Sequence, residues 1–99
     1  MPNINHLVKK FKQQPPESIF VVVRELFPSL SDREAEALYW LATGLHTSDI
    51  AKVMNVKEST IKTFISRCQI KLKAESNLEL RLQYHAKFQS FHTLLMLNI

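Results

Sequence analysis

The sequence predicts an all-α protein, and three observations support this fold class. The 99 residues include a single glycine, Gly44, and four prolines, which is too few turn-forming residues for an all-β fold. Apolar residues recur at three- and four-residue spacing, as on one face of a helix. Residues that commonly cap helices stand where helices are expected to begin, at Ser31, at Thr47 or Ser48, and at Ser76. At this length we expect one domain with one hydrophobic core.

Two short helices are expected before residue 30. The first ends at the Pro15–Pro16 pair, and its apolar residues follow helical spacing. These residues are Ile4, Leu7, Val8 and Phe11. The second helix is expected over residues 19–27 and is closed by Pro28, although the β-branched run at 19–23 also suits a strand.

Four further helices are expected after residue 30. Ser31 and Glu34 have the spacing of a capping box, and the helix that they begin ends near Gly44. Thr47 or Ser48 is expected to cap the next helix, which is short. The expected helices span about 32–44, 47–54, 58–72 and 77 into the 90s.

The net charge of +4 is unevenly distributed along the chain. Residues 13–49 carry two basic and six acidic side chains, whereas residues 50–73 carry six basic side chains and one acidic side chain. A basic block of this kind indicates a site for a polyanion, although a solvated helix face would show the same composition.

Composition also excludes several functional classes. The longest apolar run, residues 19–23, is too short to span a bilayer, and no signal peptide is recognisable, so we expect a soluble cytoplasmic protein. Cys68 is the single cysteine, which excludes an intrachain disulfide and a cysteine-based zinc site. The four histidines lack ligand spacing, and no catalytic constellation or phosphate-binding glycine loop is present. We therefore expect no enzyme activity, metal, cofactor or small-molecule ligand.

The segment from Thr47 to Leu72 fits a helix-turn-helix. Two short helices that cross steeply need a small residue where they approach, which is Ala51, and a turn residue that tolerates positive φ, which is Asn55. The apolar positions that hold the crossing angle are Ile50, Met54, Val56, Ile61 and Phe64. Because every structural position is filled and the basic block coincides with the motif, duplex DNA is the predicted partner.

The second helix of the motif has an apolar face and a polar face at about 100° per residue. The apolar face comprises Ile61, Phe64, Ile65, Cys68 and Leu72. The predicted DNA-binding residues are Ser59, Thr60, Lys62, Thr63, Ser66, Arg67 and Lys71. Short side chains let a helix approach the major groove closely, Lys and Arg reach guanine edges or phosphates, and hydroxyls near the helix start can bind a phosphate.

Residues 30 to about 86 resemble the LuxR/FixJ-type DNA-binding domain, a module of four helices. The matching stretches are LSDREAEAL at 30–38, LATGL at 41–45, DIA at 49–51, ESTIK at 58–62, KL at 71–72 and SNLEL at 76–80. The resemblance implies that Lys62, Thr63 and Ser66 face bases, with Thr60 and Arg67 nearer the backbone. The predicted regions are an N-terminal helical extension at 1–29, the LuxR-type domain at 30–86 and a C-terminal helix extension at 87–99.

Four residues depart from the family pattern. Asn55 and Lys73 stand where glycine is usual, Phe64 where histidine is common, and Ile70 where a base is common. Phe64 and Ile70 favour an alternative function, a truncated family member that pairs with a full-length regulator and antagonises it. The 29 residues before the domain are too few for the phosphoacceptor or ligand-binding domain that usually precedes it. The promoter-reading region of sigma factors has a similar pattern, but residues 76–80 match the regulator family better.

The final helix is expected to carry two apolar faces. The inward face comprises Leu80, Tyr84, Phe88, Phe91 and Leu95, with the N-terminal helices covering its distal part. Leu78 and Leu82 lie nearly opposite, and with His85 they form the predicted homodimer interface, since the family commonly dimerises through this helix. Alternatively the N-terminal helices cover that face in a monomer. RNA polymerase or another regulator are further candidate partners.

Overall fold

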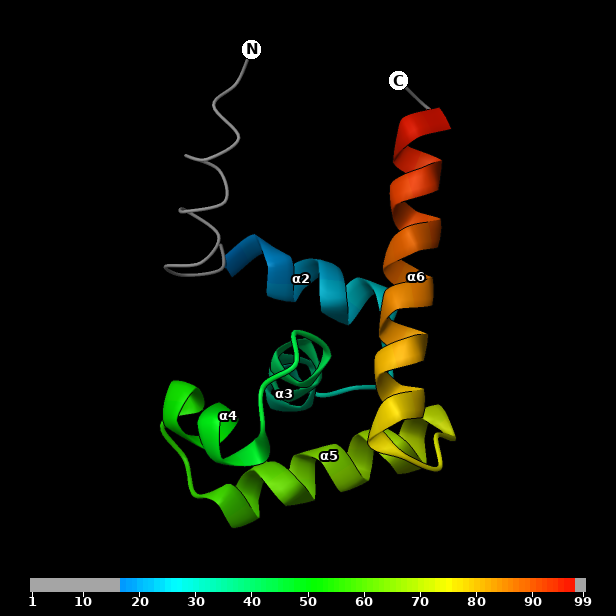
Figure 1. Cartoon of the computed structure of the whole chain (residues 1–99). Coiled ribbons are helices and arrows are strands. Elements are labelled where there is room, and N and C mark those ends of the chain that lie inside the picture. Colours follow the sequence, from blue (N-terminus) through cyan, green and yellow to red (C-terminus); the bar gives the residue numbers. More distant parts are fainter. Residues whose placement is uncertain (1–16, 98–99) are drawn as a thin grey trace.

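The computed structural model describes residues 17–97, and within that range every regular element is a helix (Figure 1). The helices are α2 (Glu17–Leu26), α3 (Asp32–Ala42), α4 (Thr47–Met54), α5 (Glu58–Leu72) and α6 (Asn77–Leu97). The predicted all-α fold is confirmed for these residues. The helix expected around residues 4–11 lies outside the described part of the chain.

α2 is a helix, so the strand alternative for residues 19–23 is wrong. Val23 and Phe27 are buried, and Phe20 meets the ring of Tyr39 on α3 edge-on, with the ring centroids 5.3 Å apart. Phe27 also stacks against Tyr84 of α6 at 6.2 Å. Packing of this apolar face against α3 outweighs the modest preference of β-branched residues for strands.

α3 lies at the centre of the fold and packs against each of the other described helices (Figure 1). Ala35 and Ala37 are fully buried, and such small side chains allow neighbouring helices to approach closely. The predicted capping box is present. Ser31 Oγ accepts a hydrogen bond from the Glu34 backbone N–H at 3.2 Å, and Glu34 Oε1 accepts one from the Ser31 N–H at 2.9 Å.

Three helix ends use a residue with positive φ. Gly44 follows α3 at φ 98°, Asn55 ends α4 at φ 55°, and Lys73 ends α5 at φ 54°. The predictions for Gly44 and Asn55 are confirmed. Lys73, which replaces the usual glycine of the LuxR-type pattern, adopts the left-handed conformation that glycine would take most easily.

The prediction that Thr47 or Ser48 caps α4 is wrong. The N-cap residue is His46, whose side chain makes no capping hydrogen bond. Thr47 lies inside the first turn of α4, and its hydroxyl instead donates to Glu58 Oε1 of α5 at 2.9 Å. The hydroxyl therefore links two helices rather than closing one.

α6 begins as predicted, because Ser76 Oγ accepts a hydrogen bond from the Glu79 N–H at 3.1 Å. Leu80 and Tyr84 are buried, Phe88 and Phe91 are half-buried, and Leu95 is exposed. The inward face is thus buried at its start and becomes exposed where α6 extends past α3, α4 and α5 (Figure 1). None of the described helices is long and apolar enough to cross a membrane.

Candidate nucleic-acid interface

α4 and α5 form the predicted helix-turn-helix. Ile50, Ala51 and Met54 are buried on α4, and the turn is closed by the Val56 N–H, which donates to the Ala51 carbonyl at 3.0 Å. Asn55 supplies the left-handed residue between the helices. The motif therefore rests on a small buried residue and a turn residue in the positions that the sequence indicates.

α5 buries the apolar face that the spacing predicts. Ile61, Ile65 and Cys68 are buried, while Phe64 and Leu72 are half-buried and pack against the core. Because Phe64 is half-buried against the core, this departure from the family pattern has a structural role within the chain. Cys68 Sγ lies 3.5 Å from the Glu34 carbonyl oxygen, and burial raises the pKa of the thiol to about 12. Cys68 is a core residue, as predicted.

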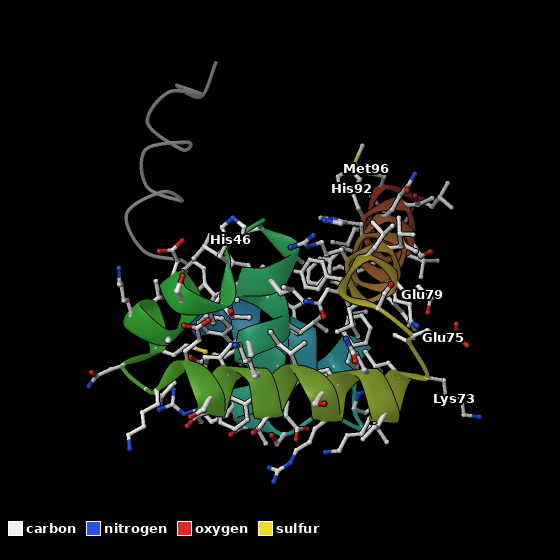
Figure 2. The ribbon with its side chains drawn as sticks, turned by 60° about the horizontal axis from the view of Figure 1, so that its bottom comes forward. His46, Lys73, Glu75, Glu79, His92 and Met96 are labelled. Carbon is white, nitrogen blue, oxygen red and sulfur yellow. The ribbon has the colours of Figure 1, made fainter. Side chains whose placement is uncertain are left out.

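The opposite side of α5, which we call the outer face, is exposed. Its residues are Ser59, Lys62, Thr63, Ser66, Arg67 and Ile70. Figure 2 shows side chains of α5 projecting away from α3. Thr63 donates its hydroxyl to the Ser59 backbone carbonyl at 3.1 Å, so the Thr63 side chain lies close to the helix surface. Thr60 is half-buried and therefore less accessible than the exposed Ser59, and its backbone N–H donates to the Lys57 carbonyl at 3.0 Å.

The basic residues around α5 differ in their partners. Lys62 Nζ lies 3.7 Å from Glu58 Oε1, and Lys71 Nζ lies 2.6 Å from Glu34 Oε1. Within residues 17–97, the remaining cations of the 50–73 segment form no ion pair with an acidic side chain. These cations are Lys52, Lys57, Arg67 and Lys73. The α4–α5 region therefore presents positive charge that is not neutralised by the protein itself.

Lys71 is bound to α3, a contact that sequence reasoning missed. Glu34 is 3% exposed and accepts from Lys71 as well as from Ser31. Burial by itself would raise the pKa of Glu34, but the hydrogen bond and charge of Lys71, with the bonds from Ser31, hold this pKa below its ordinary value. The pair fixes the last turn of α5 to the first turn of α3. Local spacing identifies Glu34 as a cap, and nothing local indicates a partner so far along the chain.

The three residues predicted for dimerisation differ in whether they contact the rest of their own chain. Leu78 and Leu82 are 62% and 60% exposed, so both are available to a partner. His85 Nε2 lies 3.1 Å from the Ala42 carbonyl oxygen at the end of α3. His85 is therefore already engaged within its own chain, although the residue as a whole is exposed.

The fold and the exposed polar face define a helix-turn-helix protein of the four-helix kind, built from α3, α4, α5 and α6. The family model for bacterial regulatory proteins of the luxR family matches residues 28–82. The chain belongs to this family. No solved structure shows a significant match.

Two curated proteins are similar to part of the chain. One is the transcriptional regulatory protein DesR of Bacillus subtilis (strain 168), 36% identical over 50 residues, which are 50% of this chain and 25% of DesR. Another is the nitrate/nitrite response regulator protein NarP of Escherichia coli (strain K12), 35% identical over 60 residues, which are 61% of this chain and 28% of NarP. The similarity thus spans about a quarter of the length of these relatives.

Proposed function

We propose that this protein is a cytoplasmic transcriptional regulator that binds duplex DNA sequence-specifically by placing α5 in the major groove. The observation that carries the proposal is the outer face of α5, where short hydroxyl side chains stand between exposed cations on a luxR-family fold. Short residues allow close approach of the helix, and the cations supply attraction to phosphates and hydrogen bonds to guanine.

Within this proposal the side chains of α5 have different roles. Lys62, Thr63 and Ser66 contact base edges, because they lie on the exposed side of the first two and a half turns. Ser59 and Arg67 contact phosphates, and the half-buried Thr60 contributes a hydroxyl at the edge. Lys71 adds positive charge at the far end while remaining paired with Glu34. The names of the two relatives support a regulatory role for the shared region.

Selection of bound sequences from a random DNA pool tests the proposal directly and yields the site. Lys62→Ala and Arg67→Ala are then measured on that site, because both side chains lie on the outer face and neither should open a cavity. Loss of a phosphate contact should reduce the slope of the logarithm of the binding constant against the logarithm of the salt concentration by about one unit. Loss of a base contact should weaken the base preference at one position of the DNA site, at a cost of roughly 1–3 kcal/mol of binding free energy. Unchanged affinity in both variants would show that α5 is not the DNA-contacting helix.

We further propose that the protein acts as a homodimer. Leu78 and Leu82 are the exposed apolar residues at the start of α6, within the region that matches the luxR family or at its edge. A two-fold pair would place two copies of α5 about one DNA turn apart, ~34 Å, and so predicts an inverted repeat in the selected sequences. His85 is a secondary member of this interface because its ring also contacts the Ala42 carbonyl.

One observation favours a second function, in which the chain pairs with a full-length relative and antagonises it. Ile70 is 76% exposed at the C-terminal end of the outer face, where an apolar side chain offers nothing to a phosphate. A retardation assay with random duplex at low salt separates the two functions. A working DNA-binding helix should show weak non-specific binding there, whereas the antagonist would bind a relative and no duplex.

A further inference from the structure

We infer that Glu58 lowers the affinity of α5 for DNA by holding back Lys62, an inference that rests on the DNA-binding function proposed above. Glu58 is the single acidic residue among residues 50–73, and it is the first residue of α5. Its side chain is 45% exposed, on the same end of the helix as the residues proposed to contact bases. An acid at this place needs explanation, because an approaching phosphate would be repelled by it.

Two contacts fix the carboxylate of Glu58. Its Oε1 atom accepts a hydrogen bond from Thr47 Oγ1 on α4 at 2.9 Å. The same oxygen lies 3.7 Å from Lys62 Nζ, one turn further along α5. Glu58 is therefore tethered to α4 while it attracts the ammonium group of Lys62. Glutamate four residues before lysine is the favourable order for such a pair on a helix.

The carboxylate of Glu58 competes with DNA for the ammonium group of Lys62. A phosphate or a guanine edge that takes the ammonium of Lys62 must replace the carboxylate of Glu58. Arg67, on the same outer face, has no acidic partner within residues 17–97 and bears no such penalty. Glu58 thus acts as a positioning residue whose effect on DNA passes through Lys62.

This arrangement gives a specific expectation for the binding energy. Because the penalty arises when Lys62 leaves Glu58, it applies both when Lys62 contacts a base edge in the selected site and when it contacts a phosphate of random duplex. Glu58 should therefore reduce the overall affinity without changing the order in which sequences are preferred. Such a residue limits retention of the protein on random duplex, where phosphate contacts supply most of the attraction.

Glu58→Gln tests the inference, because glutamine keeps the size and the acceptor for Thr47 but removes the charge. We expect affinity for both random and selected duplex to rise roughly three- to tenfold at moderate salt, with a logarithmic salt slope steeper by up to about one unit. Glu75→Gln is the matched control, since it removes the same charge from an exposed residue beyond the other end of α5. The control should change affinity less than twofold, and thermal melts establish that each variant is folded.

The route through Lys62 is tested by repeating Glu58→Gln in a Lys62→Ala background. The gain should shrink to less than about twofold, since no ammonium group is then held back. A gain of the same size in that background, or no gain in the wild-type background, overturns the inference. Glu58→Ala serves as a second variant and should give the same gain if glutamine disturbs the fold. A wild-type protein that binds no duplex at low salt would instead overturn the proposed function itself.

Discussion

At the scale of single residues, Glu34 connects three parts of the molecule. Its carboxylate accepts the Ser31 N–H at the start of α3 and the ammonium group of Lys71 at the end of α5, while its backbone carbonyl lies near Cys68. A buried carboxylate is costly unless its hydrogen-bonding capacity is used, and here Ser31 and Lys71 both donate to it. The direction of α5, and with it the outer face, therefore depends in part on this pair.

The lowered pKa of Glu34 predicts a pH dependence of stability. Because the pKa in the folded state lies below the ordinary value of 4.5, Glu34 remains ionised in the folded chain at a pH where the unfolded chain takes up a proton. Its contribution is complete above about pH 4.5 and is lost as the pH falls from there through the folded pKa. Denaturant unfolding between pH 7 and pH 3 measures this loss.

Lys71→Met provides the check on that assignment. The variant should lose roughly 1–3 kcal/mol at pH 7, because a buried carboxylate is left without its cation, and part of the acid sensitivity should disappear. Lys52→Met removes an exposed cation that has no acidic partner in residues 17–97, and it should leave both quantities unchanged. Equal behaviour of the two variants would show that the Glu34–Lys71 pair adds no stability.

At the scale of the helices, the ends of α4 and α5 decide where the outer face points. Asn55 and Lys73 both end their helices at positive φ, and the N–H groups of these residues close onto carbonyls of the last turn. Asparagine tolerates this conformation comparatively well, whereas lysine pays the ordinary penalty of a residue with a Cβ atom. We therefore expect the C-terminal end of α5 to be less stable with lysine at position 73 than it would be with glycine there.

Lys73→Gly should for this reason stabilise the protein. We expect the free energy of unfolding to rise by about 1 kcal/mol, since glycine removes the left-handed penalty, although it also makes the unfolded chain more flexible. Lys73→Ala keeps a Cβ atom while removing the charge, and it should give no such gain. A Lys73→Gly melting temperature at or below that of the alanine variant would contradict the strain assigned to this position.

At the scale of the whole molecule, α6 has two distinct surfaces. Leu80 and Tyr84 complete the core, and the ring of Tyr84 stacks on Phe88 with centroids 4.5 Å apart. On the other side of α6, the exposed Leu78 and Leu82 leave apolar surface uncovered near the start of the helix. A helix with one face buried and another apolar face exposed suits association with a second copy.

Replacing both exposed leucines tests the homodimer. Leu78→Glu with Leu82→Glu should give a folded monomer by sedimentation and circular dichroism, with weaker binding to an inverted repeat, because two like charges per chain would meet in the interface. Val53→Glu, at an exposed apolar residue of α4, should not alter the sedimentation of the protein. A wild-type protein that remains monomeric at high concentration would contradict the proposal, as would a double variant that remains dimeric.

The sequence by itself determined the features that depend on local spacing. The buried face of α5, the capping box at Ser31, the left-handed residues Gly44 and Asn55, and the luxR-family pattern all follow from residues a few positions apart. Helix periodicity and capping act over one or two turns, so the linear order of residues carries this information directly. The family match over residues 28–82 confirms the resemblance to the LuxR-type domain that these motifs indicate.

Only the tertiary structure decided the contacts between distant parts of the chain. It paired Lys71 with Glu34, engaged Thr47 with Glu58 instead of leaving it as a cap, and brought His85 to the end of α3. It also selected a helix for the β-branched run in α2, where burial against α3 outweighed local preference. Each of these outcomes depends on which faces meet after the helices pack, and helical spacing fixes the faces but not the neighbours that cover them.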